Sequence, residues 1–249
     1  SIIIDEVMNA SVFQSKFQPE VEAILPMFSD KFLLYMPKDI VSGDFVWKFS
    51  DDDYELVAVA DCTGHGVPGA MLTMLGMSSL HEIALSGTRN SAEILEMLRS
   101  KIIGYMSMNA LNKMEDGMDI SLIVINKKTL ELNFAGAYNN LLYIRDGELC
   151  KLKATRCPIG DYIVSLKFES QYLQLKKGDC IFMLSDGFIS QFGGPEGRKF
   201  PQQQLFDILK ENHDKPMEEL KLILTENFRN WQGERFQVDD VSILGFRVG

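Results

Sequence analysis

The residues of this chain best suited to chemistry are aspartates at the ends of apolar runs. Asp44 begins one such run, Asp61 and Asp186 each follow one, and the pair Asp239-Asp240 precedes the last. Taken singly, an aspartate beside a glycine turn is typical of a structural cap. Several carboxylates that meet next to buried strands are costly, however, because burial removes water from their charges. Their recurrence predicts a shared site for a hard divalent cation with oxygen ligands.

A different chemistry remains open at Cys150 and Arg156, which have the C-x5-R spacing of cysteine-dependent phosphatases. So short a pattern often arises by chance. The five residues between them also lack the glycines that an anion-cradling loop usually needs. We interpret the four cysteines as reduced core residues of a cytosolic protein, and keep a cysteine phosphatase as an alternative of another class.

The elements that must position these residues occur in blocks of strands and blocks of helices. Because the blocks do not alternate regularly as βαβ units, the sequence predicts an α+β fold in which antiparallel sheets are covered by helices. A Gly-rich loop is expected at 187–197. Strands are expected at 32–36, 44–49, 54–60, 118–125, 130–136, 140–145, 148–152, 162–175, 179–185 and 241–246, and helices at about 67–85, 91–111, 201–212 and 216–230.

Residues 1–25 are predicted to form an N-terminal linker or regulatory helix ahead of a domain at 26–249. Apolar residues recur there at spacings of three and four, and Pro19 is expected to break or restart the helix. Such a helix usually covers the core of its own domain. It could also pair with a second copy and form a homodimer. Because the chain begins with Ser, we expect a fragment of a longer protein with a sensor or membrane region upstream.

Composition argues against several classes of function. The chain has 249 residues and 46% hydrophobic content, enough for a large core. Its formal net charge of −10 disfavours nucleic acid and anionic membranes, and no block of Lys and Arg offsets that charge. No apolar stretch reaches the ~18 residues of a membrane span, and no signal peptide opens the chain. We expect a cytoplasmic domain without nucleic-acid or membrane contacts of its own. It could be the output domain of a longer, membrane-anchored protein.

The motifs around the aspartates resemble an ordered series that characterises one family. Over about residues 26–249 the series is similar to that of the SpoIIE/RsbU-type branch of the bacterial PP2C (PPM) metal-dependent serine/threonine phosphatases. That resemblance implies a PP2C-like α-β-β-α sandwich, with two antiparallel sheets flanked by helix pairs. The motifs are Gly43-Asp-Phe45, Asp61-Cys-Thr-Gly-His-Gly-Val-Pro-Gly-Ala70, Asp116-Gly-Met-Asp-Ile-Ser121, Phe134-Ala-Gly-Ala137, Pro158-Ile-Gly160, Ser185-Asp-Gly187, Gln191-Phe-Gly-Gly194, Trp231 and Asp239-Asp-Val-Ser242.

The resemblance also implies two Mn²⁺ or Mg²⁺ ions. Asp61 would bridge them, and the backbone carbonyl of Cys62, where relatives usually have Gly, would add a ligand to one. Asp186 would hold the other ion together with Asp239 or Asp240, with Asp239 the preferred member of the pair.

Further roles follow from the same resemblance. Asp44 would bind the second ion directly or through water, and Asp116 matches a third, weaker metal position from which the nearby Asp119 is not separated. His65 is a candidate proton donor to the leaving seryl oxygen, because histidine is the residue type whose unperturbed side chain suits an acid near neutrality. The phosphate-clamping Arg that eukaryotic relatives carry near Asp44 is missing here.

The resulting hypothesis is a metal-dependent phosphatase in which a metal-activated water hydrolyses phosphoserine or phosphothreonine on a bacterial signalling protein. The resemblance indicates a STAS-domain anti-sigma-factor antagonist as that partner. The alternative is a catalytically silent phosphoprotein-binding module of the same fold.

Overall fold

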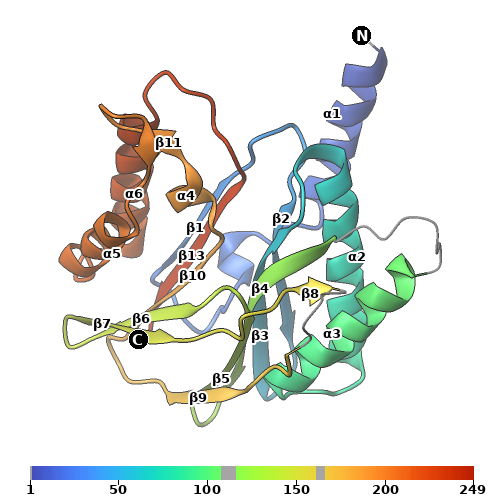
Figure 1. The fold of residues 1–249 in the computed structure, drawn as a ribbon. Helices are drawn as coiled ribbons and strands as arrows, with labels where there is room; N and C mark the ends of the chain where they lie inside the picture. Colours follow the sequence, from blue (N-terminus) through green and yellow to red (C-terminus); the bar gives the residue numbers. More distant parts are fainter. Residues whose placement is uncertain (1, 108–115, 161–165) are drawn as a thin grey trace.

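The computed structural model describes residues 2–107, 116–160 and 166–249, which form two antiparallel sheets packed between layers of helices (Figure 1). The first sheet contains, in spatial order, β2 (Asp44–Ser50), β3 (Tyr54–Cys62), β4 (Gly117–Asn126), β5 (Glu131–Ala137) and β9 (Gln171–Gln174), with β8 (Ile159–Gly160) paired to β4. The second contains β1 (Lys31–Met36), β13 (Val241–Arg247), β10 (Cys180–Leu184), β6 (Leu141–Arg145) and β7 (Glu148–Leu152).

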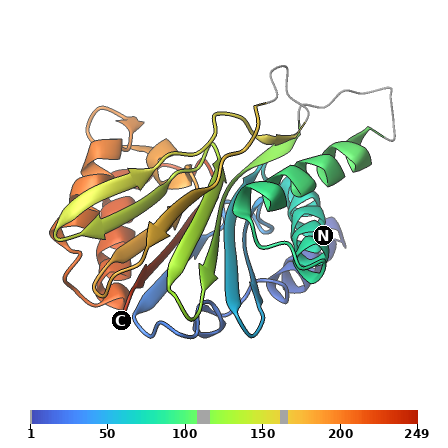
Figure 2. The ribbon, with the colours of Figure 1, turned by 90° about the horizontal axis from the view of Figure 1, so that it is seen from below.

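Helix pairs cover the two outer faces (Figures 1 and 2). Helices α2 (Gly66–Leu85) and α3 (Ser91–Met106) lie on the first sheet. Helices α5 (Gln202–Glu211) and α6 (Met217–Gln232) lie on the second, beside the short α4 (Gly187–Ser190). The α-β-β-α sandwich expected from the sequence is therefore confirmed.

Strand β3 shows how the sequence specifies this layering. Val57 and Val59 belong to the core between the sheets, whereas Leu56 and Ala58 pack in the core under α2 and α3. Successive side chains of a strand point to opposite faces. A strand buried on both faces therefore reads as a continuous apolar run, which explains why β3 was recognisable without alternation. The same alternation places Asp61, two residues beyond Val59, on the side between the sheets.

Three expected elements differ from the observed ones. The strand expected at 162–175 is only β9 in the described part of that segment, and residues 161–165 lie outside the description. The loop expected at 187–197 contains α4 and the start of a small hairpin of β11 (Phe192–Gly193) and β12 (Arg198–Lys199). Two-residue strands are too short to show periodicity. Helix α3 ends at Met106, and residues 108–115 are not described.

The N-terminal segment contains α1 (Ile2–Ser15), none of whose residues is buried, and the single 3-10 turn η1 (Val21–Ala23). Helix α1 ends before Pro19, and the side chain of Gln14 ties it to the backbone of Ser42 through two hydrogen bonds. Ile24 and Leu25 lie in the core between the sheets. The packed domain thus already includes the end of the segment that we predicted as a linker, and the boundary at residue 26 stays a prediction.

No helix in the described ranges has both the length and the apolar character required to cross a membrane.

Candidate active site

Three carboxylates stand side by side across neighbouring strands of the first sheet. Asp44 on β2 is the register partner of Asp61 on β3, which is in turn the partner of Asp119 on β4. Directly paired residues project from the same face of a sheet, with Cβ atoms about 4.5 to 5.5 Å apart. All three carboxylates therefore face the space between the sheets, at its end.

The second sheet supplies two more carboxylates. Asp186 comes two residues after β10, and Asp239 two residues before β13, the antiparallel neighbour of β10. Gly187 makes this approach possible, because a Cβ atom there would lie 1.8 Å from the carbonyl oxygen of Asp240. The motif Ser185-Asp186-Gly187 therefore supplies a carboxylate and also lets its backbone pass close to the backbone at Asp240.

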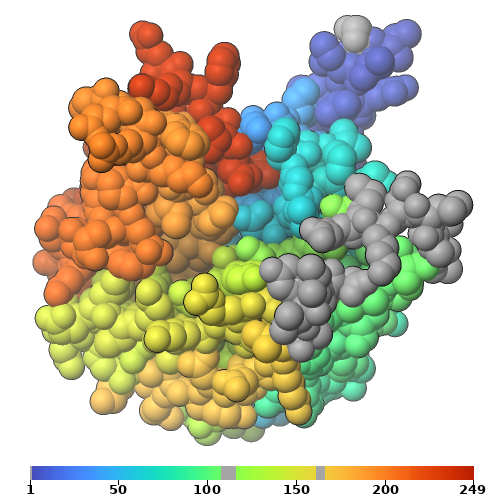
Figure 3. Space-filling view, in the orientation of Figure 1, coloured from blue at the N-terminus to red at the C-terminus, as the bar shows by residue number. Residues whose placement is uncertain are grey.

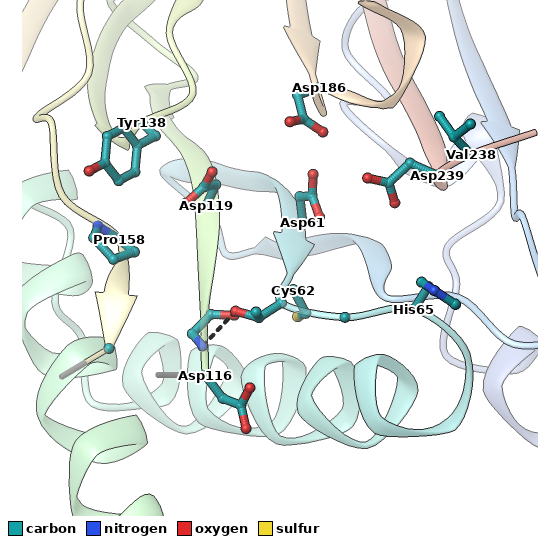
Figure 4. Close-up of a pocket in the computed structure, with 14 residues that line it drawn as sticks. Asp61, Cys62, His65, Asp116, Asp119, Tyr138, Pro158, Asp186, Val238 and Asp239 are labelled. Atoms are coloured by element: carbon teal, nitrogen blue, oxygen red, sulfur yellow. Dashed lines mark hydrogen bonds between the residues drawn. The ribbon is translucent and has the colours of Figure 1, made fainter. Parts of the chain in front are cut away.

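Four of these carboxylates line a common cavity. Figure 4 shows those of Asp61, Asp119, Asp186 and Asp239 directed toward one another. The open cavity has a volume of about 540 Å³. Its remaining described lining residues are Cys62, Thr63, Gly64, His65, Asp116, Gly117, Tyr138, Pro158, Gly160 and Val238. This lining contains no Lys or Arg among the described residues, so the cavity itself offers no fixed cation for an anionic group.

Burial and mutual repulsion oppose ionisation of these acids. Burial, followed by the negative charges of Asp44 and Asp186, raises the pKa of Asp61 to about 10. Burial and the charge of Asp186 raise the pKa of Asp119 to about 7. The pKa of Asp239 is also raised, mainly by burial. Without a counter-charge, the cluster therefore holds protons that ordinary surface aspartates release.

Asp44 lies deepest, at 1% exposure. Its Oδ2 accepts a hydrogen bond from the Ser242 hydroxyl at 2.7 Å, whereas its Oδ1 is buried and has no partner among the described residues. Burial raises the pKa of this carboxyl to about 7, although the hydroxyls of Ser242 and Ser185 oppose the shift. A buried acceptor without a partner leaves its desolvation uncompensated.

This donor set fits a divalent cation. It consists of oxygen atoms, it carries excess negative charge, and one oxygen of Asp44 is unpaired. Within the described ranges, no three acidic, histidine or cysteine side chains are arranged so that all could ligate one ion as they stand. Such an ion would therefore complete its shell with water, as Mg²⁺ commonly does when one or two carboxylates hold it.

The final pair of aspartates divides into two roles. The Asp240 carboxylate is buried and accepts hydrogen bonds from the backbone N–H groups of Lys38 and Gly43, each at 2.8 Å. Asp239 lines the cavity and turns its carboxylate toward the cluster in Figure 4. The geometry therefore favours Asp239 over Asp240 as a metal ligand and makes Asp240 an anchor for the loop before β2.

The other candidates occupy the lower edge of the cavity. Asp116 lines it, but its carboxylate points away from the cluster in Figure 4. The thiol of Cys62 receives a hydrogen bond from Thr73 and belongs to the apolar core, so a main-chain group is what Cys62 can offer the site. Burial raises the pKa of this thiol far above its ordinary value.

His65 lies at the rim, and its Nδ1 is joined to Oδ2 of Asp39 by a 2.7 Å hydrogen bond. An ionised carboxylate can only accept, so Nδ1 carries the proton when Asp39 is ionised and Nε2 is left for other partners. Positive φ angles at Gly64 (80°) and Gly66 (65°) turn the chain on either side of His65. The imidazole is thus held by a residue that the sequence analysis did not single out.

Cys150 and Arg156 are not part of the site. Cys150 lies on β7 in the second sheet, and its thiol donates to the Glu148 carbonyl. Neither residue is among the described residues that line the acidic cavity.

Some site residues were missed or left unresolved by the sequence. Asp119 was not separable from Asp116, and the pairing of β3 with β4 would have identified it, because only Asp119 is in register with Asp61. Ser242 was named only as part of the final motif, without a role, and Asp39 was not named, since each acts through a partner distant in the chain, Asp44 and His65 respectively.

Comparisons with known proteins agree with this geometry. The family model "Stage II sporulation protein E (SpoIIE)" matches residues 51–249. No curated protein gives a significant sequence match. The solved SiaA-PP2C domain of Pseudomonas aeruginosa is similar at 33% identity with a TM-score of 0.87, covering 99% of this chain and 97% of that one.

More distant structures share the fold. The PP2C phosphatase domain of SpoIIE from Bacillus subtilis, solved with a fragment of its regulatory domain, has 20% identity and a TM-score of 0.69 over 88% of this chain and 63% of that one. RsbX in complex with magnesium has 15% identity and a TM-score of 0.59 over 87% of this chain and 94% of that one. The chain belongs to the SpoIIE family, the SpoIIE/RsbU-type branch of the PP2C serine/threonine phosphatases.

Proposed function

We propose that this domain hydrolyses phosphoserine or phosphothreonine on a protein by means of two Mn²⁺ or Mg²⁺ ions. The observation that carries the proposal is the row of Asp44, Asp61 and Asp119 in register on three strands, faced by Asp186 and Asp239 from the other sheet. Such a concentration of buried carboxylates is unfavourable unless cations neutralise it.

Asp61 occupies the centre of the row and is therefore the residue proposed to bridge the ions, with the Cys62 carbonyl beside it. Asp186 and Asp239 would hold the second ion, with Asp44 beneath them. Asp240 is not included, because backbone N–H groups bind both of its carboxylate oxygens, whereas Asp239 accepts such a bond at one oxygen only. When bound, the ions would lower the pKa of a water molecule and neutralise charge on the phosphoryl group.

The protein's own residues would contribute position and proton transfer. Ser242 fixes one oxygen of Asp44 and leaves the other free to bind. Asp39 orients His65 at the cavity rim, where the imidazole could protonate the leaving seryl oxygen. The third, weaker metal is better assigned to Asp119 than to Asp116, since the Asp119 carboxylate is the one directed toward the cluster.

The proposed substrate is a phosphorylated STAS-domain protein of a bacterial signalling pathway in the cytoplasm. The described cavity lining contains no Lys or Arg, so the protein adds little attraction for phosphate beyond the ions. Affinity must then come from surfaces outside the cavity, which favours a folded partner over a loose peptide. The domain would act as the output module of a longer protein and dimerise through α1.

The test is release of phosphate from a serine-phosphorylated STAS-domain protein in Mn²⁺ and in chelator. Asp61→Asn and Asp186→Asn should each reduce the rate by at least ~100-fold, because each removes a ligand for the catalytic ions. Tyr172→Ala, on the exposed edge strand β9, is the control and should retain full activity. Tight binding of the phosphoprotein without turnover at any metal concentration would instead favour a silent binding module.

A further inference from the structure

Two exposed phenylalanines belong to neighbouring backbone segments near the acidic cavity. Phe192, on β11, is 43% exposed, and Phe236, between α6 and β13, is 92% exposed. The side-chain amide of Gln191 donates to the backbone carbonyls of both residues, at 3.0 Å each. The two aromatic residues therefore come from segments that share one donor, although they are 44 positions apart in the sequence.

Their backbone is firmly held, so the exposed rings are not on a loose loop. Gln191 is fully buried and its Oε1 also accepts from the N–H of Val238. Gln232 donates to the carbonyl of Arg235. A large apolar side chain that is held in water contributes no burial free energy to folding. Exposed apolar residues that lie close to one another mark interaction surfaces.

Two cationic side chains lie on the same segments or next to them. The Lys199 ammonium lies 5.9 Å from the centre of the Phe192 ring, and the Arg235 guanidinium would meet a Cβ atom at Gly197 at 3.1 Å. Arg198 is paired with Glu196, whereas neither Lys199 nor Arg235 forms an ion pair with any residue that the structure describes. We call Phe192, Lys199, Arg235 and Phe236 the aromatic rim.

The aromatic rim adjoins the proposed catalytic site. Val238 and Asp239, two and three residues after Phe236, line the acidic cavity. In Figure 3 the red segment between α6 and β13 borders one side of the hollow in the surface, near the orange atoms that include β11 and β12. A protein that presents a phosphorylated side chain to the cavity would be within reach of the rim.

We propose that the aromatic rim is the docking surface for the phosphoprotein substrate, and that it fits a folded partner with an apolar side chain and a carboxylate near the phosphorylated residue. This inference rests on the proposed function and names how that site selects its substrate. Aromatic side chains and arginine are the usual anchors of protein interfaces. The unpaired cations give the rim local attraction for an acidic partner, in a chain whose formal net charge is −10.

The experiment compares two substrates, p-nitrophenyl phosphate and a serine-phosphorylated STAS-domain protein, in Mn²⁺. Phe236→Ala should lower kcat/KM for the phosphoprotein about tenfold, as loss of an interface anchor does, and leave that for p-nitrophenyl phosphate unchanged. Lys199→Glu should act in the same direction and reduce the salt dependence of kcat/KM for the phosphoprotein. Tyr172→Ala removes another exposed ring, on β9 and outside the aromatic rim, and should change kcat/KM for neither substrate.

Binding of the phosphoprotein, measured by calorimetry, separates this inference from the proposed activity. If Phe236→Ala weakens binding about tenfold, the aromatic rim is supported as the docking surface even where no turnover is seen. Unchanged binding by Phe236→Ala and Lys199→Glu would overturn it. Equal losses of kcat/KM for both substrates would also overturn it. Such losses would mean that Phe236→Ala disturbs the nearby Asp239 and does not act through docking. Absence of turnover by the wild type on both substrates would refute the proposed function alone.

Discussion

Asp61 is predicted to be a residue that destabilises the metal-free fold. Its carboxyl lies between Asp44 and Asp119 and keeps a pKa of about 10. In chelator at pH 8, Asp61→Asn should therefore raise the free energy of unfolding, by about 1 to 3 kcal/mol, because it removes a carboxyl whose ionisation is opposed. Urea denaturation measures this change.

The same variant should respond less to metal. Mn²⁺ should stabilise the wild type clearly and Asp61→Asn only weakly, since a ligand that binds the folded state stabilises it in proportion to its affinity. If Asp61→Asn proves less stable than the wild type in chelator, repulsion does not dominate at this position and the assignment of the cluster as a cation site loses its main support.

Asp239 and Asp240 are adjacent but should behave differently. Asp240→Asn places an amide where two backbone N–H donors converge, so one donor loses its acceptor and stability should fall by about 2 to 4 kcal/mol. Asp239→Asn should leave stability within about 1 kcal/mol of the wild type and weaken Mn²⁺ binding. Thermal unfolding and metal titration of both variants distinguish the roles. Equal losses of metal affinity would mean that both carboxylates hold the ions.

The sequence identified the carboxylates by their place at the ends of apolar runs. Asp44, Asp61, Asp186 and Asp239 all lie at the site. It did not separate Asp119 from Asp116, because which of them faces the site depends on the register between β3 and β4, and a shift of one residue would reverse the faces.

Gly187 is predicted to be indispensable for joining α4 to β13, and with them the two halves of the site. A Cβ atom there would overlap the Asp240 carbonyl oxygen. Gly187→Ala should therefore push α4 away from β13, lower stability by roughly 3 kcal/mol or more, and separate Asp186 from Asp239. Denaturant unfolding and metal titration measure the two effects.

Gly104→Ala provides the matched control. Gly104 lies in α3, where an added Cβ atom meets nothing within 4 Å. The substitution should be neutral or stabilise by up to ~1 kcal/mol, because alanine is the better helix former. Equal behaviour of the two variants would show that the crossing at Gly187 tolerates a side chain and is not what brings Asp186 to the cluster.

Elements were predictable where burial fixed their pattern. The helix over α2 and the strands β3 and β10 were expected within two residues of their observed ends, since each is a long apolar run. The hairpin of β11 and β12 was read as a loop. Its position depends on Trp231, whose indole donates to the carbonyls of Gln191 and Arg198 across more than 30 residues, a contact that no local pattern reveals.

Helix α1 is predicted to bind a second copy of the chain and form a homodimer. It exposes Ile4, Met8 and Val12 by more than half and buries none of its residues. Light scattering of the wild type should give the mass of a dimer. Met8→Glu should give a monomer, because a charge at such an interface is costly. Lys16→Glu, just beyond the helix, is the control. An unchanged mass for Met8→Glu would exclude α1 as the dimer contact.

The acidic cluster should also set how stability of the whole domain depends on pH. Folding raises the pKa of Asp44 and Asp119 to about 7 and that of Asp61 to about 10, above the value of 3.8 for a free aspartate. The folded state therefore binds more protons than the unfolded state, and stability falls as pH rises from about 4 through these values. In chelator, the melting temperature should decrease between pH 5 and pH 8 by several degrees.

Divalent metal should reverse this trend. Cations compete with protons for the same carboxylates, so the gain in melting temperature from Mn²⁺ or Mg²⁺ should be larger at pH 8 than at pH 5. Other acids also repel one another in a chain of net charge −10, and the difference between the wild type and Asp119→Asn isolates the cluster from that background. If the metal-free melting temperature rises from pH 5 to pH 8, or if metal stabilises equally at both, the clustered carboxylates are not what the cations relieve.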